Sequence, residues 1–378
     1  MSKQRQKLYL FSNQGHLKPV FALPCSTGKA KGDKKKRGDR KTPEGVYFFE
    51  KKISHGLDFA LYGGIAFTLN YPNPVDKLFS KTGHGIWLHG RGNPIKPFNT
   101  KGCVAVNVSC LPLIQKYIVF HQTPILITQD FKKIKNKQDN FGQKIIKNIV
   151  QWKKNWQNKK EKFFSFYDHK LVIGKRYGYH SFVQNKKRLF RLYQWIDIFI
   201  SRPKLVAGPG YVVSYFKQLF RSPGHTSLGI KRLYWLKRDQ TWKIVGEEWY
   251  GLKDEQFQKQ YLEKRTKQIK VWLKKWKQAW ENTDLNSYAN FYSSNSRQGK
   301  IKGLKNILAF KQKLWSKIKP KCITIHDIKV FLHPKGFKVS FIQQYEDNSG
   351  YSDLGQKTLL IEPNGDGFKI LSEQWIAL

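Results

Sequence analysis

The chain has 378 residues, enough for two or three domains of ordinary size. Hydrophobic residues make up 40% of it and aromatic residues 15%, which excludes a disordered protein. A formal net charge of +44 predicts attraction to polyanions such as nucleic acid, envelope polymers or membrane surfaces. Because lysine dominates this excess and is spread along the whole chain, we do not expect functional nucleic-acid binding.

The amino-terminal residues, MSKQRQKLYLFSNQGH, contain no apolar segment of signal-peptide length, and nowhere do about 18 apolar residues run together. The sequence therefore shows no export signal. Its four cysteines, Cys25, Cys103, Cys110 and Cys322, lack the spacing of a zinc site or a disulfide framework, so no metal site is expected.

Short alternating apolar runs with frequent glycine and proline make the first part of the chain, residues 1–132, a mainly-β domain. The predicted strands are residues 7–11, 20–23, 45–51 and 123–128, and the predicted short helix is residues 111–119. Between the second and third strands lies a lysine-rich loop that ends near Asp39. We interpret this loop as a solvated surface segment.

Residues 84–110 of this domain read HGIWLHGRGNPIKPFNTKGCVAVNVSC. His89 follows an apolar, strand-like run, and a Gly/Asn/Pro loop then leads to Cys103. A thiol is a good nucleophile only as thiolate, so a cysteine of ordinary pKa, about 8.5, needs an imidazole or electropositive backbone nearby. Gly102 would let backbone N–H groups around Cys103 face a substrate carbonyl. The alternative is that Cys103 is a small buried hydrophobe and His89 a structural side chain.

This stretch resembles the active-site motif of the L,D-transpeptidase (YkuD-type) family, in which His-Gly is followed by [Ser/Thr]-x-Gly-Cys. Residues 89–90 and 100–103 match it, and the STGK and GDRKTPEGVY segments at residues 26–29 and 38–47 are similar to the family's STG…GDxxTPEGxY pattern. The resemblance implies a catalytic pair and a set of oxyanion or substrate-binding residues. The pair is Cys103 as nucleophile and His89 as base, and the set is Gly102, Gly90, Thr100, Lys101 and His84.

Two departures from the family pattern bear on the reaction. Ala105 stands where the family usually has an arginine, and the loop between His89 and Thr100 is shorter than usual. Both features resemble the cell-shape L,D-carboxypeptidases, a sub-branch that joins this catalytic domain to a nuclear transport factor 2-like module. Transpeptidation and carboxypeptidation therefore both stay open.

After a polar linker at residues 130–143, the chain contains an internal repeat with a period near 126 residues. The clearest pair is WKIVGEEW at residues 242–249 and FKILSEQW at residues 368–375. Each copy is predicted to begin with an amphipathic helix and to end in several strands. We place the copies at residues 133–252 and 253–378, and we expect the second to be the better preserved.

In the second copy, Trp272, Trp276 and Trp280 recur on one helical face and should pack against the sheet. The predicted strands are residues 323–330, 338–345, 357–361 and 368–375. The copies resemble the nuclear transport factor 2-like fold, a cone in which a curved sheet wraps around helices. His326 and Asp327 are neighbours on a predicted strand, so we expect their side chains to face opposite ways.

The sequence thus predicts a multidomain α+β protein with a mainly-β, L,D-transpeptidase-like catalytic domain followed by two cone-shaped repeats. The resemblance implies a cysteine enzyme that cleaves the bond between an L-centre and D-alanine in peptidoglycan tetrapeptide stems through a Cys103 thioester, passed to an amine or to water. This chemistry needs no metal or organic cofactor. The implied location is the periplasm or cell envelope, and a homodimer or protein partner through the repeats is expected. The rival hypothesis is a non-catalytic, basic, cell-wall-binding protein.

Overall fold

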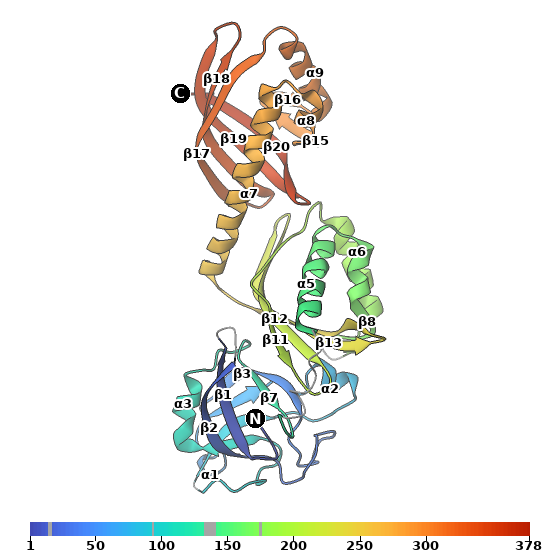
Figure 1. The fold of residues 1–378 in the computed structure, drawn as a ribbon, viewed down its shortest axis with the longest axis vertical. Coiled ribbons are helices and arrows are strands. Elements are labelled where there is room, and N and C mark those ends of the chain that lie inside the picture. The colour runs from blue at the N-terminus through green and yellow to red at the C-terminus, as the bar shows by residue number, and fades with distance from the viewer. Residues whose placement is uncertain (14–16, 93, 132–140, 174–175) are drawn as a thin grey trace.

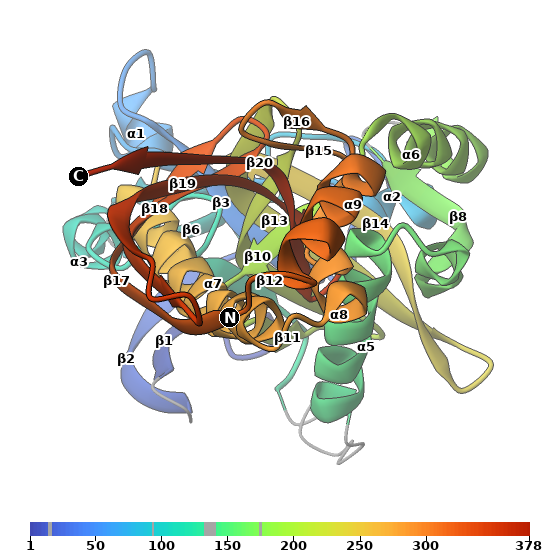
Figure 2. The same cartoon turned by 90° about the horizontal axis from the view of Figure 1, so that it is seen from above.

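The computed structural model describes residues 1–13, 17–92, 94–131, 141–173 and 176–378. The described residues form three β-sheets that follow one another along the chain, each with its own helices. They build an elongated molecule with the amino terminus in the first part and the carboxyl terminus in the last (Figure 1). In the view along the long axis, the three sheets with their helices overlap (Figure 2). The multidomain α+β fold expected from the sequence is confirmed.

The amino-terminal domain contains one seven-stranded sheet in the order β1-β2-β6-β5-β4-β3-β7. Its strands are β1 (Lys7–Asn13), β2 (Leu17–Ser26), β3 (Gly45–Ile53), β4 (Ala66–Leu69), β5 (Trp87–Arg91), β6 (Val104–Asn107) and β7 (Pro124–Ile127). Its helices are α1 (Phe59–Tyr62), α2 (Pro74–Leu78) and α3 (Leu111–Gln115), with a 3-10 turn, Val108–Cys110, before α3. The predicted strands are confirmed, but the helix expected at residues 111–119 ends at Gln115.

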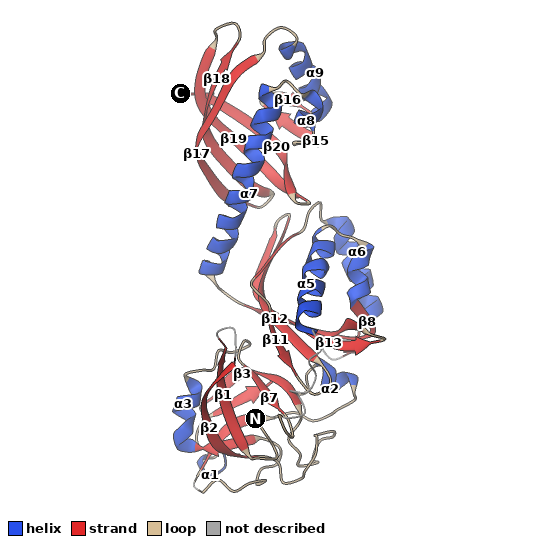
Figure 3. Cartoon of the chain, viewed as in Figure 1, coloured by secondary structure: helices blue, strands red, loops and turns tan. Residues whose placement is uncertain are grey.

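The first repeat contains a sheet in the order β10-β12-β13-β14-β8-β9, with β11 beside β12. Its strands are β8 (Tyr167–Ile173), β9 (Arg176–Tyr177), β10 (Asp197–Ile200), β11 (Lys204–Ala207), β12 (Val212–Ser222), β13 (His225–Arg238) and β14 (Thr241–Gly251). Helices α5 (Phe141–Gln157) and α6 (Tyr179–Leu192) lie on one side of this sheet (Figure 3), and a 3-10 segment, Glu161–Phe166, follows α5. Residues 132–140 of the predicted linker lie outside the described residues.

The second repeat has the corresponding sheet, in the order β16-β15-β20-β19-β18-β17. Its strands are β15 (Tyr292–Gln298), β16 (Ile301–Lys302), β17 (Pro320–His333), β18 (Gly336–Asp347), β19 (Ser352–Asn364) and β20 (Gly367–Ala377). Its helices are α7 (Glu255–Glu281), α8 (Leu285–Ala289) and α9 (Leu304–Trp315). The three tryptophans predicted to share one face of α7 are buried in the core, as expected.

The expectation for His326 and Asp327 is wrong. A bulge in β17 shifts the register between His326 and Lys329, and Asp327 adopts a positive φ of 55°. The alternation of side chains fails there, and the His326 Nδ1 atom lies 3.1 Å from the Asp327 carboxylate. Both side chains are exposed, so the contact marks an irregular surface position.

A shared apolar cluster joins the amino-terminal domain to the first repeat; it includes Val46, Phe48 and Val75 from the former and Val213 and Val245 from the latter. Helix α7 then joins the two repeats. Its first turns pack with residues of the first repeat, and its later turns enter the core of the second. Among the described residues, no helix is long and apolar enough to cross a membrane.

Candidate active site

The parallel pairing of β5 with β6 places the two candidate catalytic residues on neighbouring segments: His89 is opposite Ala105, and Cys103 lies directly before β6. Leu88 pairs with Val104 in this ladder, and both are fully buried. His89 follows Leu88 and Cys103 precedes Val104. Because neighbouring residues alternate across a strand, the His89 side chain points to the sheet face opposite Leu88. Cys103 lies directly before β6, with its Sγ near the carbonyl oxygen of Gly85.

The His89 ring is held in one orientation by its own strand. Its Nδ1 atom lies 2.8 Å from the carbonyl oxygen of Gly90. A carbonyl oxygen only accepts hydrogen bonds, so Nδ1 carries the proton and Nε2 is left as the basic nitrogen. The Tyr62 ring meets the imidazole edge-on, with 5.1 Å between centroids. Burial lowers the pKa of His89, which favours the neutral imidazole.

The Cys103 thiol is half-buried and donates to the carbonyl oxygen of Gly85 at 3.4 Å. Burial raises the pKa of Cys103, and the Trp87 backbone N–H and the Lys34 ammonium only partly oppose this effect. The sequence suggested an activated thiolate, whereas the resting environment favours a neutral Cys103 thiol and a neutral His89 imidazole. The reason is desolvation, which disfavours both charged forms.

Thr100 braces the turn that carries the thiol. Its hydroxyl donates to the carbonyl oxygen of Cys103 at 2.7 Å and accepts from the N–H of Gly102 at 3.1 Å. Gly102 has a φ of +135°, and a Cβ atom there would lie 3.0 Å from the carbonyl oxygen of Lys41. The Gly102 N–H is therefore engaged by Thr100, while the Cys103 N–H has no partner among the residues that the structure describes.

The two sequence motifs lie side by side. The Lys29 N–H donates to the Thr100 carbonyl oxygen and the Thr100 N–H donates to the Thr27 carbonyl oxygen, both at 2.9 Å. Further along the same loop, the buried Lys34 pairs with Asp39 at 2.7 Å. The lysine-rich loop that we interpreted as a solvated segment is thus anchored beside the Cys103 turn.

The remaining candidate residues occupy different positions. A Cβ atom on Gly90 would come within 2.8 Å of Leu111, so the glycine allows close packing there while its carbonyl orients His89. Lys101 is exposed at the tip of the turn. His84 is also exposed, next to the glycine whose carbonyl accepts from the thiol. Lys101 and His84 are thus both exposed, whereas Gly90 is buried within β5.

Sequence reasoning missed two neighbours of the pair. Tyr62, at the end of α1, contacts both His89 and Trp87 through its ring. Lys34 contributes positive potential at Cys103. The only sequence signal for Tyr62 was the capped turn that starts at Asp58, and Lys34 was hidden among other lysines of its loop.

Comparison with known proteins agrees with this geometry. Residues 1–110 match the model of the L,D-transpeptidase catalytic domain, and residues 144–248 and 268–374 each match the Cds6 C-terminal NTF2-like domain. The chain belongs to the L,D-transpeptidase proteins that carry Cds6-type NTF2-like domains. It is therefore an L,D-transpeptidase-type enzyme by family.

Solved structures of this family resemble the chain over most of their own length. Bd1075 of Bdellovibrio bacteriovorus is 32% identical, with a TM-score of 0.54, and the match covers 67% of this chain and 91% of that one. Pgp2 of Campylobacter jejuni, described as a helical cell shape determining protein, is 27% identical with a TM-score of 0.53, over 65% of this chain and 89% of that one. No curated protein sequence gives a match.

Proposed function

We propose that the protein cleaves the bond between the L-centre and D-alanine of peptidoglycan tetrapeptide stems through a thioester on Cys103. Family membership supports the substrate class. The single observation that supports the assignment of residues is the β5·β6 register, which pairs His89 with Ala105, two residues after Cys103 and its Thr100-held turn.

In the proposed reaction, His89 Nε2 takes the thiol proton while Sγ attacks the carbonyl carbon of the third stem residue. Proton transfer that accompanies attack suits a pair whose resting forms are both neutral. The carbonyl oxygen becomes an oxyanion, for which the Cys103 N–H is a candidate donor. The C–N bond then breaks, D-alanine leaves with the proton from His89, and a thioester remains on Cys103.

The acceptor of the thioester decides which of two activities results. Water gives a tripeptide and an L,D-carboxypeptidase, whereas an amine of a neighbouring stem gives a cross-link and an L,D-transpeptidase. We favour trimming, because Ala105 is fully buried and replaces the arginine usual in the family. The similarity to Pgp2 supports a role in cell shape, exerted in the periplasm or cell envelope.

The test is to incubate the full chain with disaccharide tetrapeptide, with and without an acceptor stem, and to resolve the products by mass. We expect tripeptide without cross-links, and its loss in Cys103→Ala. Cys110→Ala is the matched control, because this half-buried thiol lies seven residues further along the same segment. Cross-linked products would assign transpeptidation instead. If wild type and Cys103→Ala were equally inert, the wall-binding alternative would replace the enzyme.

A further inference from the structure

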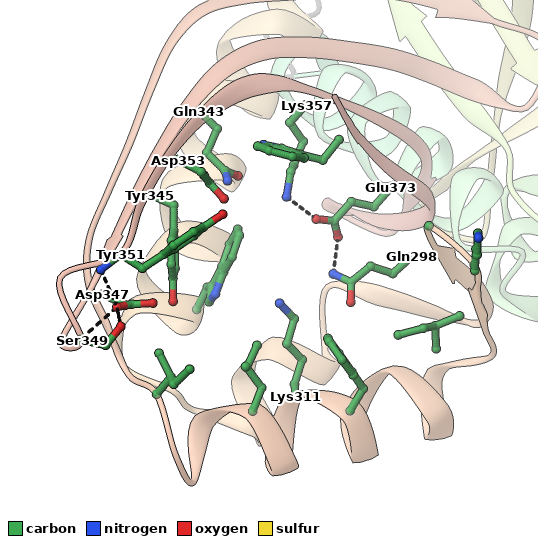
Figure 4. A pocket seen from close by; sticks show the side chains of 18 residues that line it. Gln298, Lys311, Gln343, Tyr345, Asp347, Ser349, Tyr351, Asp353, Lys357 and Glu373 are labelled. Carbon is green, nitrogen blue, oxygen red and sulfur yellow. Dashed lines mark hydrogen bonds and ion pairs between the residues drawn. The ribbon is translucent and has the colours of Figure 1, made fainter. Parts of the chain in front are cut away.

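The sheet of the second repeat has an inner face and an outer face. Its inner face packs on α7, and Gln343, Lys357 and Glu373 line a cavity on this side (Figure 4). Because side chains alternate along a strand, Thr358 and Gln374, which follow Lys357 and Glu373, lie on the outer face. The outer face is therefore separate from the cavity.

One ion pair marks equivalent positions in the two repeats. In the first repeat the Lys231 ammonium lies 2.5 Å from the Glu247 carboxylate. In the second the Lys357 ammonium lies 2.6 Å from the Glu373 carboxylate. In both sheets the next residue of each strand points outward, and these two residues are partners in the ladder. The outward partners are Arg232 and Glu248 in the first repeat and Thr358 and Gln374 in the second.

The amino-terminal domain covers the outer face of the first repeat. Arg232 is fully buried there, and it donates to the carbonyl oxygen of His121 at 2.8 Å. Its guanidinium lies 3.9 Å from the centroid of the Phe48 ring. Val213 and Val245 are also fully buried, in the apolar cluster shared with that domain. The outer face of the first repeat is thus a docking surface within the chain.

The equivalent face of the second repeat is open. Ile376 is 66% exposed and Leu354 is 45% exposed. Leu360 occupies the position of the buried Tyr234, yet it is partly exposed. The outward positions in the middle of β18, β19 and β20 are Ser340, Ile342, Gln344, Leu354, Gln356, Thr358, Leu360, Ser372, Gln374 and Ile376. None of these side chains is charged, although the chain contains 70 lysine and arginine residues. The second repeat therefore presents an uncharged and partly apolar face to solvent.

The charge of the chain decides which partner suits this face. With a formal net charge of +44, two copies repel each other over most of their surfaces, so a contact between copies needs a face without further positive charge. An anionic polymer would instead be bound by lysine and arginine side chains, which the middle of this face lacks. Glutamine, threonine and serine side chains both donate and accept hydrogen bonds, so a face that carries them can pair with its own copy about a twofold axis.

We propose that two copies of the chain associate through the outer faces of their second repeats. Ile342, Leu354, Leu360 and Ile376 form the apolar centre of this contact, and the glutamines around them pair across the twofold axis. Burial of the exposed leucine and isoleucine side chains supplies the driving force. The dimer joins two amino-terminal domains in one assembly. This inference goes beyond the proposed function and does not depend on the role of Cys103.

Sedimentation velocity of the full chain over a range of micromolar concentrations tests the proposal. We expect a dimer that is as tight or tighter when the salt concentration is raised, because salt screens the repulsion between the copies. Ile376→Lys places a charge in the contact and should weaken dimerisation at least about tenfold. Val271→Lys is the matched control, because Val271 is also exposed, at 59%, but lies on α7, so this change should leave the dimer intact.

Cross-linking provides a second measurement that does not rely on weakening the contact. Gln356 pairs with Ile342 and Ile376 at the centre of the face, so Gln356→Cys should give a covalent dimer with a short bis-maleimide, whereas Val271→Cys should not. Both changes are made in a chain carrying Cys322→Ser, because Cys322 is exposed. That chain alone measures the background from the remaining cysteines, and a thermal melt of each variant checks folding.

Three results of sedimentation would overturn the proposal: a wild-type chain that stays monomeric, a dimer that a folded Ile376→Lys chain retains at full strength, and a dimer that dissociates in high salt. The last result would show that a bound polyanion bridges the copies. Equal cross-linking of Gln356→Cys and Val271→Cys would also contradict the proposal, since the contact would then belong to no particular face.

Discussion

The hydroxyl of Tyr211 in the first repeat accepts a hydrogen bond from the backbone N–H of Val46 in the amino-terminal domain, at 2.7 Å. The same hydroxyl accepts from the side-chain amide of Asn73 at 2.9 Å. All three residues are buried. One side chain thus satisfies two donors of another domain, which fixes the first repeat against β3, whose first residues belong to the GDRKTPEGVY segment.

Tyr211→Phe should lower the free energy of unfolding by about 1–3 kcal/mol, because it leaves two buried donors without an acceptor. Urea denaturation of the full chain measures this loss. Tyr215→Phe is the control, since Tyr215 packs on Phe48 while its hydroxyl has no hydrogen-bond partner among the described residues. Equal effects of the two changes would show that the Tyr211 hydroxyl is not what matters.

The rate of tripeptide release should depend on pH through His89. Burial lowers the pKa of His89 below its ordinary value of 6.5, so the imidazole stays neutral further into acid than a free histidine. A base must be neutral to accept the thiol proton, so activity should rise with pH through a midpoint below 6.5. The initial rate between about pH 4 and 8 measures it.

His84→Asn separates the two histidines near the thiol, because His84 is exposed. The midpoint should stay where it was in this variant, whatever happens to the rate. If the midpoint disappeared in His84→Asn, the titrating group would be His84, which would contradict our assignment of it to His89.

Thr100→Val should lower kcat roughly 100-fold, because misplacement of a reacting group by about 1 Å has costs of this order. The change removes the hydroxyl that holds both the Cys103 carbonyl and the Gly102 N–H. Thr100→Ser keeps that hydroxyl and should stay within a few-fold of wild type. If Thr100→Ser lost as much activity as Thr100→Val, the methyl group of Thr100, and not its hydroxyl, would be the group that activity requires.

Asp197→Asn should lower the free energy of unfolding by about 3–5 kcal/mol, the range for breaking a buried ion pair. Asp197 is fully buried and pairs with Arg265 of α7, while it also accepts from the Tyr261 hydroxyl at 2.6 Å. Glu346→Gln, which breaks an exposed pair with Lys321, should leave the free energy of unfolding almost unchanged, because solvent screens this pair. Similar losses of unfolding free energy in Asp197→Asn and Glu346→Gln would show that burial does not determine how much an ion pair stabilises this protein.

Much of the fold could be predicted because local patterns match it. The tryptophans of α7 recur on one helical face, and the alternating runs of the second repeat became strands of one sheet. The bulge in β17 could not be predicted, since nothing in the residues around His326 marks the extra residue. The boundaries we placed between the domains stay predictions.

Only those residues of the candidate site that belong to a sequence motif could be predicted. His89 and Cys103 stand in such a motif, and their assigned roles stay predictions. The raised pKa of Cys103 depends on how many atoms surround the sulfur, which the sequence does not contain. The contacts of Tyr62 with His89 and of Tyr211 with Val46 arise from segments far apart in the chain, so no local pattern records them.

The position of α7 limits how the molecule can be dissected. Phe257 and Tyr261, near its start, cover Leu219 and Leu228 of the first repeat, whereas Trp276 and Trp280 belong to the second. A fragment that stops at residue 252 would keep the amino-terminal domain and the first sheet, but it would expose the two leucines to water. The two repeats should therefore be kept together in any truncated variant. Aggregation of a fragment that ends at residue 252 would indicate that the two leucines have become exposed.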